Sequence, residues 1–317
     1  MTSQSELMES GPSGVFAASL TPMTADLEID HKRLMAHGHW LLANGCDGLA
    51  PLGTTGEANS LSVDERMAVL DAYGQSDIPG DCLIPGVGSC AIPDAVRLIR
   101  RCLEMGAAGC LMLPPFYYKG VSDDGLFAAF SETIQRVGDS KLRLYLYNFP
   151  QQVGFPLSQE LVTRLVKAYP DTVVGMKDSS GDWDNMAATL KNNPGFRLLP
   201  GSEEFLLKGL RAGAVGCISA TVNVTAALSG AVFTAWQHDG NAKQVDALQD
   251  RLTAARKAFA GPPVIPALKG FLAAESGDTA WLPCRPPNMA LSAADVAALQ
   301  DRLKQAGFRL SSLPQAA

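Results

Sequence analysis

One lysine of this sequence stands where its amine could act as a nucleophile. Lys177 follows the apolar run VVGM at 173–176 and precedes the polar turn DSSG at 178–181. Apolar surroundings disfavour a charged ammonium, so a neutral amine becomes accessible that can attack a carbonyl and form a Schiff base. The structural alternative is that Lys177 only pairs with Asp178 or another carboxylate at the rim of the fold.

Phenol and threonine hydroxyl groups occupy comparable positions, each directly after an apolar run. They are Tyr147 in LYNFP, Tyr117 and Tyr118 in PPFYYK, and Thr54 and Thr55 in LGTTGE. Hydroxyls within hydrogen-bond reach of an imine can relay the protons of carbinolamine formation and C–C cleavage. The structural alternatives are packing tyrosines with a hydroxyl in water and a TTGE segment that is only a turn at a helix start.

The elements that would position these residues are short apolar runs, each followed by a helical pattern. The runs begin at Gly14, Gly48, Leu83, Cys110, Arg143, Val173, Phe196 and Gly216. Nearly continuous apolarity is typical of parallel strands that are covered on both faces. Helix start signals lie between the runs, at Asp30, at Ser62 with Glu65 three residues later, and at Ser158.

This order of eight β-then-α units, ending near Trp236, predicts an α/β fold of the (β/α)8 TIM barrel class with a C-terminal helical extension. In such barrels the carboxyl ends of the strands share one face, which brings the candidate residues together. We expect a single domain that consists of a loose N-terminal arm at 1–13, the barrel at 14–238 and the extension at 239–317.

The expected extension contains three helical patterns, near 240–258, 264–275 and 291–305. Their Leu and Ala spacing suits amphipathic helices that pack on the barrel or on a neighbouring subunit. Two lysines in helical stretches, Lys208 and Lys269, are expected to lie in solvent.

Composition and charge exclude several classes of protein. Hydrophobic residues make up 47% of the 317 residues and charged residues 18%, as in a folded globular protein. A formal charge of -6 without a run of Lys and Arg argues against nucleic-acid binding. No apolar stretch approaches the roughly 18 residues of a membrane span, and the polar first residues do not resemble a secretory signal. Seven cysteines without a C-x-x-C pair suit reduced thiols, so we expect a cytoplasmic protein with a small-molecule partner.

Neither a metal nor an organic cofactor is expected. His37 and His39 are two residues apart on an expected helix and therefore point to different faces, which does not suit a shared metal. The glycine-rich segment PGVGS at 85–89 lacks the spacing of dinucleotide and P-loop motifs.

The segments LGTTGE, PPFYYK, YNFP and GMKDSSGD, in this order, resemble the dihydrodipicolinate synthase and N-acetylneuraminate lyase family of pyruvate-type class I aldolases. The resemblance covers nearly the whole chain. It implies that Lys177 forms the Schiff base and that Tyr147 shuttles protons beside it. It also implies that Ile218, through its backbone carbonyl, and Gly201 line the site.

The same resemblance implies roles for the threonines and for one tyrosine. Thr54 and Thr55 match the pair that handles the proton relay and the pyruvyl carboxylate. Tyr118, rather than Tyr117, matches the tyrosine that in relatives reaches into the active site of an adjacent subunit. A homo-oligomer, either a dimer or a tetramer, is therefore implied.

The sequence also departs from the family pattern. Gln152 stands where members that make dihydrodipicolinate carry an arginine for the carboxylate of the second substrate, and an amide lacks both the charge and the bidentate fork. Glu203 and Glu204 match an acidic pair that in sialic acid lyases helps hold sugar hydroxyls, and we expect Glu204 to face the substrate. The alternative is that both acids only favour a helix start through its dipole. Ala220 replaces a serine of those lyases, which disfavours N-acetylneuraminate.

The expected function is that of a Schiff-base lyase or aldolase acting on a 2-oxo acid. It would reversibly cleave a 2-keto-3-deoxy (sugar) acid or 4-hydroxy-2-oxoglutarate to pyruvate and an aldehyde, which for 4-hydroxy-2-oxoglutarate is glyoxylate. One alternative is a keto-deoxy sugar acid dehydratase that uses the same imine. Dihydrodipicolinate synthase, which Gln152 disfavours, and a non-catalytic ligand-binding barrel are the others.

Overall fold

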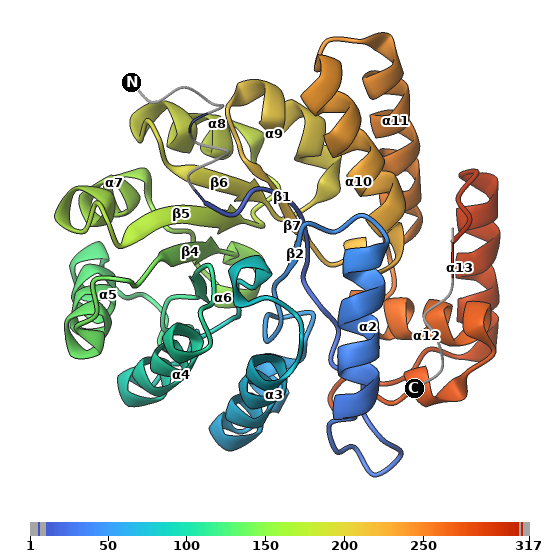
Figure 1. Ribbon diagram of the computed structural model, residues 1–317, viewed down its shortest axis with the longest axis horizontal. Helices are drawn as coiled ribbons and strands as arrows, with labels where there is room; N and C mark the ends of the chain where they lie inside the picture. Colours follow the sequence, from blue (N-terminus) through green and yellow to red (C-terminus); the bar gives the residue numbers. More distant parts are fainter. Residues whose placement is uncertain (1–5, 7–10, 311, 313–317) are drawn as a thin grey trace.

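The computed structural model describes Glu6, residues 11–310 and Ser312, and in this part of the chain strands and helices alternate around a closed barrel (Figure 1). The strands are β1 (Gly14–Ala17), β2 (Gly48–Leu49), β3 (Cys110–Met112), β4 (Leu144–Asn148), β5 (Val173–Asp178), β6 (Arg197–Pro200) and β7 (Gly216–Ser219). The surrounding helices are α2 (His31–Ala43), α3 (Val63–Gln75), α4 (Ile92–Glu104), α5 (Asp123–Val137), α6 (Pro150–Val153), α7 (Gln159–Ala168), α8 (Trp183–Asn192), α9 (Leu206–Ala212) and α10 (Val222–Asp239). Short 3-10 helices are η1 (Ala58–Ser60), η2 (Gly80–Cys82), η3 (Glu203–Phe205) and η4 (Thr279–Trp281).

The strands form two parallel sheets, in the orders β2-β1-β7 and β3-β4-β5-β6. On one side the sheets are joined through residues 83–87, where the Ile84 N–H donates to Leu49 O at 2.9 Å and the Val87 N–H donates to Leu111 O at 2.9 Å. On the other side the Val215 N–H donates to Leu198 O at 3.0 Å. The predicted (β/α)8 barrel is confirmed by this closure.

The strand expected from Leu83 is the exception to the predicted set. This segment forms isolated bridges, from Leu83 to Leu49 and from Gly86 to Leu111, rather than a continuous strand. Pro85 lies between the two bridges and has no N–H to donate to a ladder, which accounts for the interruption. The segment still occupies the place of the third strand in the wall.

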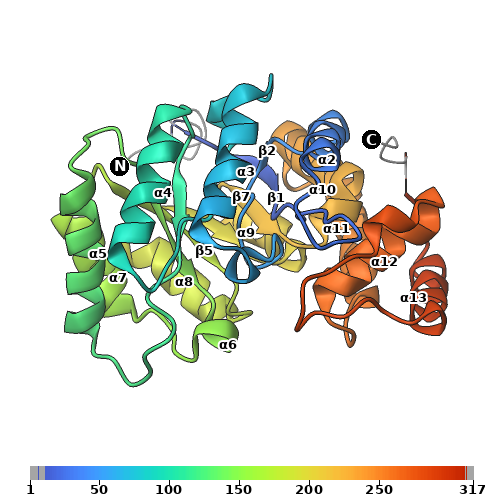
Figure 2. The ribbon, with the colours of Figure 1, turned by 90° about the horizontal axis from the view of Figure 1, so that it is seen from below.

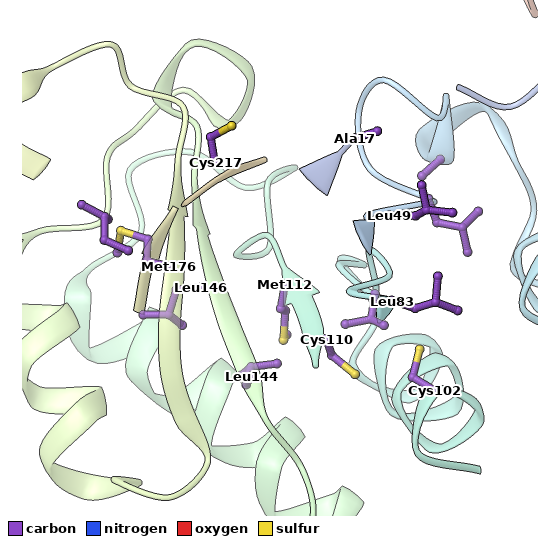
Figure 3. Packing of buried hydrophobic residues seen from close by; sticks show 14 of the residues in the cluster. Ala17, Leu49, Leu83, Cys102, Cys110, Met112, Leu144, Leu146, Met176 and Cys217 are labelled. Atoms are coloured by element: carbon purple, nitrogen blue, oxygen red, sulfur yellow. The ribbon is translucent and has the colours of Figure 1, made fainter. Parts of the chain in front are cut away.

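Buried strand side chains alternate between two clusters. An outer cluster packs against the helices, as Figure 3 shows for Cys110 of β3, which lies beside Cys102 of α4. An inner cluster fills the barrel and includes Phe16, Leu111 and Tyr145. Since side chains alternate along a strand, Met176 in the outer cluster turns its neighbour Lys177 to the interior.

The predicted helix starts are confirmed. The Asp30 side chain accepts from the Arg33 N–H at 2.9 Å, and the Ser158 hydroxyl accepts from the Leu161 N–H at 3.0 Å. Ser62 and Glu65 form the predicted capping box at the start of α3. Each cap satisfies backbone N–H groups that a helix start leaves without an intrahelical partner.

The three predicted C-terminal helices are present as α11 (Lys243–Ala258), α12 (Val264–Ser276) and α13 (Ala293–Gln305). In both views α12 and α13 lie at one side of the barrel, away from α5 and α7 (Figures 1 and 2). The division into arm, barrel and extension stays a prediction, and residues 1–5 and 7–10 of the predicted arm lie outside the described residues. Within the described chain, no helix combines the length and apolar character needed to cross a membrane.

The expectation that Lys269 lies in solvent is wrong. Its side chain is 0% exposed, and Nζ lies 2.5 Å from Oε1 of Glu57 and 2.8 Å from the Pro283 carbonyl oxygen. Helix α12 is buried continuously from Ile265 to Ala273, so the lysine has no wet face to occupy. Lys208, in contrast, is exposed as predicted.

Candidate active site

A cavity of about 510 Å³ opens at the carboxyl ends of the strands. Seven of the predicted site residues line it: Lys177, Tyr147, Thr54, Thr55, Gln152, Gly201 and Glu204. They come from the ends of four different strands and the loops that follow, which is the arrangement expected of a barrel mouth. The cavity therefore joins one amine, one phenol and two threonine hydroxyls in a single space.

Lys177 and Tyr147 face each other across neighbouring strands. The register of β4 and β5 pairs their Cα atoms directly, and Lys177 Nζ lies 4.5 Å from the centroid of the Tyr147 ring. The side chains are nearly buried, with Lys177 4% and Tyr147 3% exposed. The Tyr147 ring is held by stacking on Phe149, with 5.6 Å between ring centroids. The amine therefore lies over an aromatic face, and both residues have little exposure to solvent.

Asp178 is not the partner of Lys177. Its carboxylate accepts from Asn148 Nδ2 at 3.0 Å and Asn185 Nδ2 at 2.9 Å, and from the Ser180 N–H at 2.8 Å. These bonds use Asp178 to fix the turn after β5. The alternative in which Lys177 serves only to pair with Asp178 is therefore not what the structure contains.

The loop that carries Thr54 and Thr55 is held from both sides. The Thr21 hydroxyl donates to Gly56 O at 2.7 Å, on the barrel side. On the other side Glu57, with a left-handed φ of 55°, is fixed by the buried Lys269 of α12 and by the Arg285 N–H at 3.0 Å. The C-terminal extension thus helps to set the position of the threonines.

Gly201 lies where the wall has no room for a side chain. A Cβ at this position would come within 2.0 Å of the Ser179 hydroxyl oxygen, and the Gly201 N–H donates to Asp178 O at 2.6 Å. The close approach of β5 and the loop after β6 therefore requires glycine here.

The two acids after β6 have different environments. Glu203 is 0% exposed, and its carboxylate accepts from the hydroxyls of Ser219, Thr221 and Thr225. Glu204 is half-buried and lines the cavity. The pair is thus divided into an internal structural acid and one that faces the space a substrate would occupy.

Two predicted site residues do not line this cavity. Ile218 is 0% exposed and belongs to the inner barrel cluster, and its predicted backbone contact stays a prediction. Tyr118 is 66% exposed, in edge-to-face contact with Tyr117. Its predicted role, in the site of an adjacent subunit, also stays a prediction.

Arg256 and Val264, which were not predicted from the sequence, line the cavity from α11 and from the start of α12. Both residues belong to the C-terminal extension, so the positions of the strand ends in the sequence do not indicate them. No local sequence pattern distinguishes Arg256 from a solvated arginine of an amphipathic helix. Ser179, Ser202 and Met186 also line the cavity without having been singled out.

Comparisons with known proteins agree with this architecture. Residues 11–306 match the Dihydrodipicolinate synthetase family. A DapA-like lyase of Chloroflexus aurantiacus is 33% identical over 91% of this chain and 95% of its own length. A 4-hydroxy-tetrahydrodipicolinate synthase of Agrobacterium fabrum is also 33% identical, over 93% of this chain and 98% of its own.

Solved structures share the fold over nearly the full length. The dihydrodipicolinate synthase of Agrobacterium tumefaciens C58 superposes with a TM-score of 0.85 at 34% identity, covering 94% of this chain and 100% of the other. The prophage protein YagE of E. coli K12, solved in complex with pyruvate, superposes with a TM-score of 0.81 at 25% identity, covering 93% and 98%.

Proposed function

This chain belongs to the dihydrodipicolinate synthetase family, and we propose that it is a lysine Schiff-base lyase that acts on a 2-oxo acid through Lys177. The observation that carries the proposal is the setting of this amine. It is 4% exposed, lines a cavity at the barrel mouth and lies over Tyr147, while the adjacent Asp178 is occupied by other donors. A buried amine of this kind attacks carbonyl groups when neutral.

The proposed reaction starts with condensation of the substrate keto carbon and the Lys177 amine, which expels water and leaves a protonated imine. A base then removes the proton of the C4 hydroxyl, the C3–C4 bond breaks and its electron pair moves into the imine to form a pyruvyl enamine. The aldehyde leaves, the enamine is protonated at C3, and water hydrolyses the imine to release pyruvate. Tyr147 and Thr54 line the cavity at Lys177 and would move these protons.

The pyruvyl half of the substrate is supported by the relatives. YagE was solved in complex with pyruvate, and Thr54 and Thr55, which the family resemblance assigns to the pyruvyl carboxylate, line the cavity here. For the second half of the substrate, the exposed Gln152 at the rim of the cavity offers an amide and no positive charge. This disfavours the synthase reaction for which several relatives are named, and we propose instead cleavage of a 2-keto-3-deoxy acid or 4-hydroxy-2-oxoglutarate.

Reduction with borohydride in the presence of pyruvate, followed by peptide mass analysis, tests the proposal. We expect a reduced pyruvyl adduct on the peptide that contains Lys177, and none in Lys177→Met. Lys208→Met, which removes an exposed lysine, is the matched control and should retain the adduct. A wild-type protein without an adduct would overturn the proposal and favour a ligand-binding barrel.

Product analysis separates cleavage from dehydration. A panel of 2-keto-3-deoxy acids should yield pyruvate plus an aldehyde from at least one member. A single unsplit product that has lost water would instead identify a dehydratase that uses the same imine.

A homo-oligomer, dimer or tetramer, is part of the proposal, because Tyr118 is exposed and does not line the cavity of its own chain. The cysteines within the described chain are free, in keeping with a cytoplasmic protein. Analytical ultracentrifugation is the test of assembly. Mixing Tyr118→Phe with the inactive Lys177→Met chain should restore activity if Tyr118 serves the neighbouring site, and should not if it serves its own.

A further inference from the structure

Two cationic side chains, Lys177 and Arg256, line the cavity within the described part of the chain. Under the proposed function the Lys177 nitrogen is consumed as the imine of the keto carbon. Arg256 is then the positive charge that remains for another part of the substrate. It comes from α11, in the C-terminal extension, whereas Lys177 comes from the barrel.

The guanidinium of Arg256 has few contacts of its own. Its Nε forms an ion pair with Glu203 Oε2 at 3.9 Å, which is beyond hydrogen-bond distance, and this Nε is buried without a hydrogen-bond partner among the described residues. Glu203 does not require this arginine as a donor, because hydroxyls of Ser219, Thr221 and Thr225 already donate to its carboxylate. Arg256 therefore retains donors for a ligand.

Helix α11 is fixed so that this arginine faces the cavity. Gln249 Nε2 donates to Glu203 O at 2.9 Å, and Gln249 Oε1 accepts from the Leu207 N–H at 3.1 Å. Gln249 and Arg256 are seven residues apart, about two turns, and so lie on one face of the helix. The contact that anchors α11 to the loop after β6 thus also orients Arg256.

We propose that Arg256 binds a second anionic group, on the half of the substrate that leaves as the aldehyde. The preferred substrate is then a 4-hydroxy-2-oxo dicarboxylate rather than a keto-deoxy sugar acid, whose leaving half is uncharged. A guanidinium matches a carboxylate with two parallel N–H donors, which the amide of Gln152 cannot supply. Glu204 in the same cavity repels an anion, so acceptance of one depends on Arg256.

This inference rests on the proposed function and is tested in the condensation direction, with pyruvate and two aldehydes of similar size. Glyoxylate carries a carboxylate, whereas glycolaldehyde carries a hydroxyl. We expect wild-type protein to prefer glyoxylate. In Arg256→Gln the KM for glyoxylate should rise roughly 10- to 100-fold, as for loss of a charge-assisted hydrogen bond, with the KM for pyruvate and the reaction with glycolaldehyde little changed.

Two further variants make the result specific. Arg256→Lys keeps the charge without the fork and should recover part of the affinity for glyoxylate. Arg251→Gln removes an exposed arginine from the same helix and should leave both aldehydes unaffected. Thermal unfolding identifies a variant that fails to fold. If Arg256→Gln does not fold, the preference of the wild type and of Arg256→Lys for glyoxylate over glycolaldehyde tests the role of Arg256.

Failure of this inference is distinguishable from failure of the proposed function. A wild-type preference for glycolaldehyde, or an equal rise in KM for both aldehydes in Arg256→Gln, overturns the role of Arg256 while the borohydride adduct with pyruvate persists. Absence of that adduct in the wild type overturns the proposed function itself.

Discussion

The molecule buries two lysines in contrasting ways. Lys177 in the barrel mouth is 4% exposed and lies over the Tyr147 ring, next to an open cavity. Lys269 in the seam between α12 and the threonine loop is 0% exposed and pairs with the equally buried Glu57. The first amine faces space that a reactant can enter, and the second faces only protein. Burial alone therefore does not distinguish the two lysines, and the proposal that Lys177 is reactive rests on the cavity beside it.

The two regions are nevertheless connected. Glu57 belongs to the same loop as Thr54 and Thr55, so the ion pair in the seam holds residues that line the mouth. The contrast is between an amine that we propose is used for chemistry and an amine that fixes the loop beside it. Substitutions at the two lysines should separate these uses.

The largest effect is expected at Lys177. Lys177→Arg keeps a cation but removes the amine that forms the imine, so turnover should fall by roughly four orders of magnitude or more. The rate of pyruvate release measures this, and the midpoint of thermal unfolding should stay near that of the wild type. Turnover that survives the change would show that Lys177 is no more catalytic than Lys269.

Tyr147→Phe tests whether the phenol hydroxyl at the barrel mouth transfers protons. Loss of the phenol hydroxyl should lower kcat by roughly 10²- to 10⁴-fold, the usual contribution of a positioned proton donor or acceptor. The ring and its stacking on Phe149 are retained. Borohydride should therefore still trap pyruvate on Lys177, and an unchanged kcat would remove Tyr147 from the proton relay.

In the seam, the expected effect is on stability. Lys269→Met leaves the Glu57 carboxylate buried without its cation, so the free energy of unfolding should fall by about 3–5 kcal/mol. Denaturant unfolding measures it. The double variant Lys269→Met, Glu57→Gln should recover part of the loss, because no buried charge then remains. A loss below about 1 kcal/mol in the single variant would contradict the structural role of this pair.

The smallest expected effect is a pH dependence of stability that arises from His37 of α2. Burial lowers the pKa of His37 from 6.5 to about 4, against the bond to Asn223 Oδ1 at 2.9 Å, which raises it. Between these values the unfolded chain binds a proton that the folded one does not, so stability falls as pH drops from about 6.5 to about 4. The loss is on the order of 3 kcal/mol.

Denaturant unfolding at pH 7 and pH 4 measures this dependence. In His37→Gln, which keeps a side-chain donor for Asn223, the part of the pH dependence that comes from this ring should disappear. An identical dependence in wild type and variant would assign the acid sensitivity to other groups.

Much of the barrel is predictable because its determinants are local. Apolar runs specify buried parallel strands, and side chains such as Asp30 and Ser158 cap the helices that follow them. The site residues at strand ends follow from the same reasoning, since in a barrel all strand ends meet at one face. Lys177 was placed at the barrel mouth in this way, whereas the expectation for Glu204 came from the family resemblance, and both line the cavity.

The remaining features depend on contacts between distant segments. Arg256 faces the cavity because Gln249 anchors α11, and no spacing within the helix indicates that. Lys269 did carry a signal, which is a single lysine in a helix that is apolar on nearly all sides. Such a helix is buried, and its lysine must then find a buried partner such as Glu57.

The incomplete third strand has a consequence for how the barrel opens. At residues 83–87 the wall is held by isolated bridges rather than a ladder, next to the loop that bears the threonines, where the Gly86 N–H donates to Pro51 O at 2.8 Å. Backbone amides of residues 83–87 should exchange with deuterium earlier than those of the longer strands β4 and β5. Local opening of the barrel wall should then begin at this segment, which β3 and β4 separate from β5, the strand that carries Lys177.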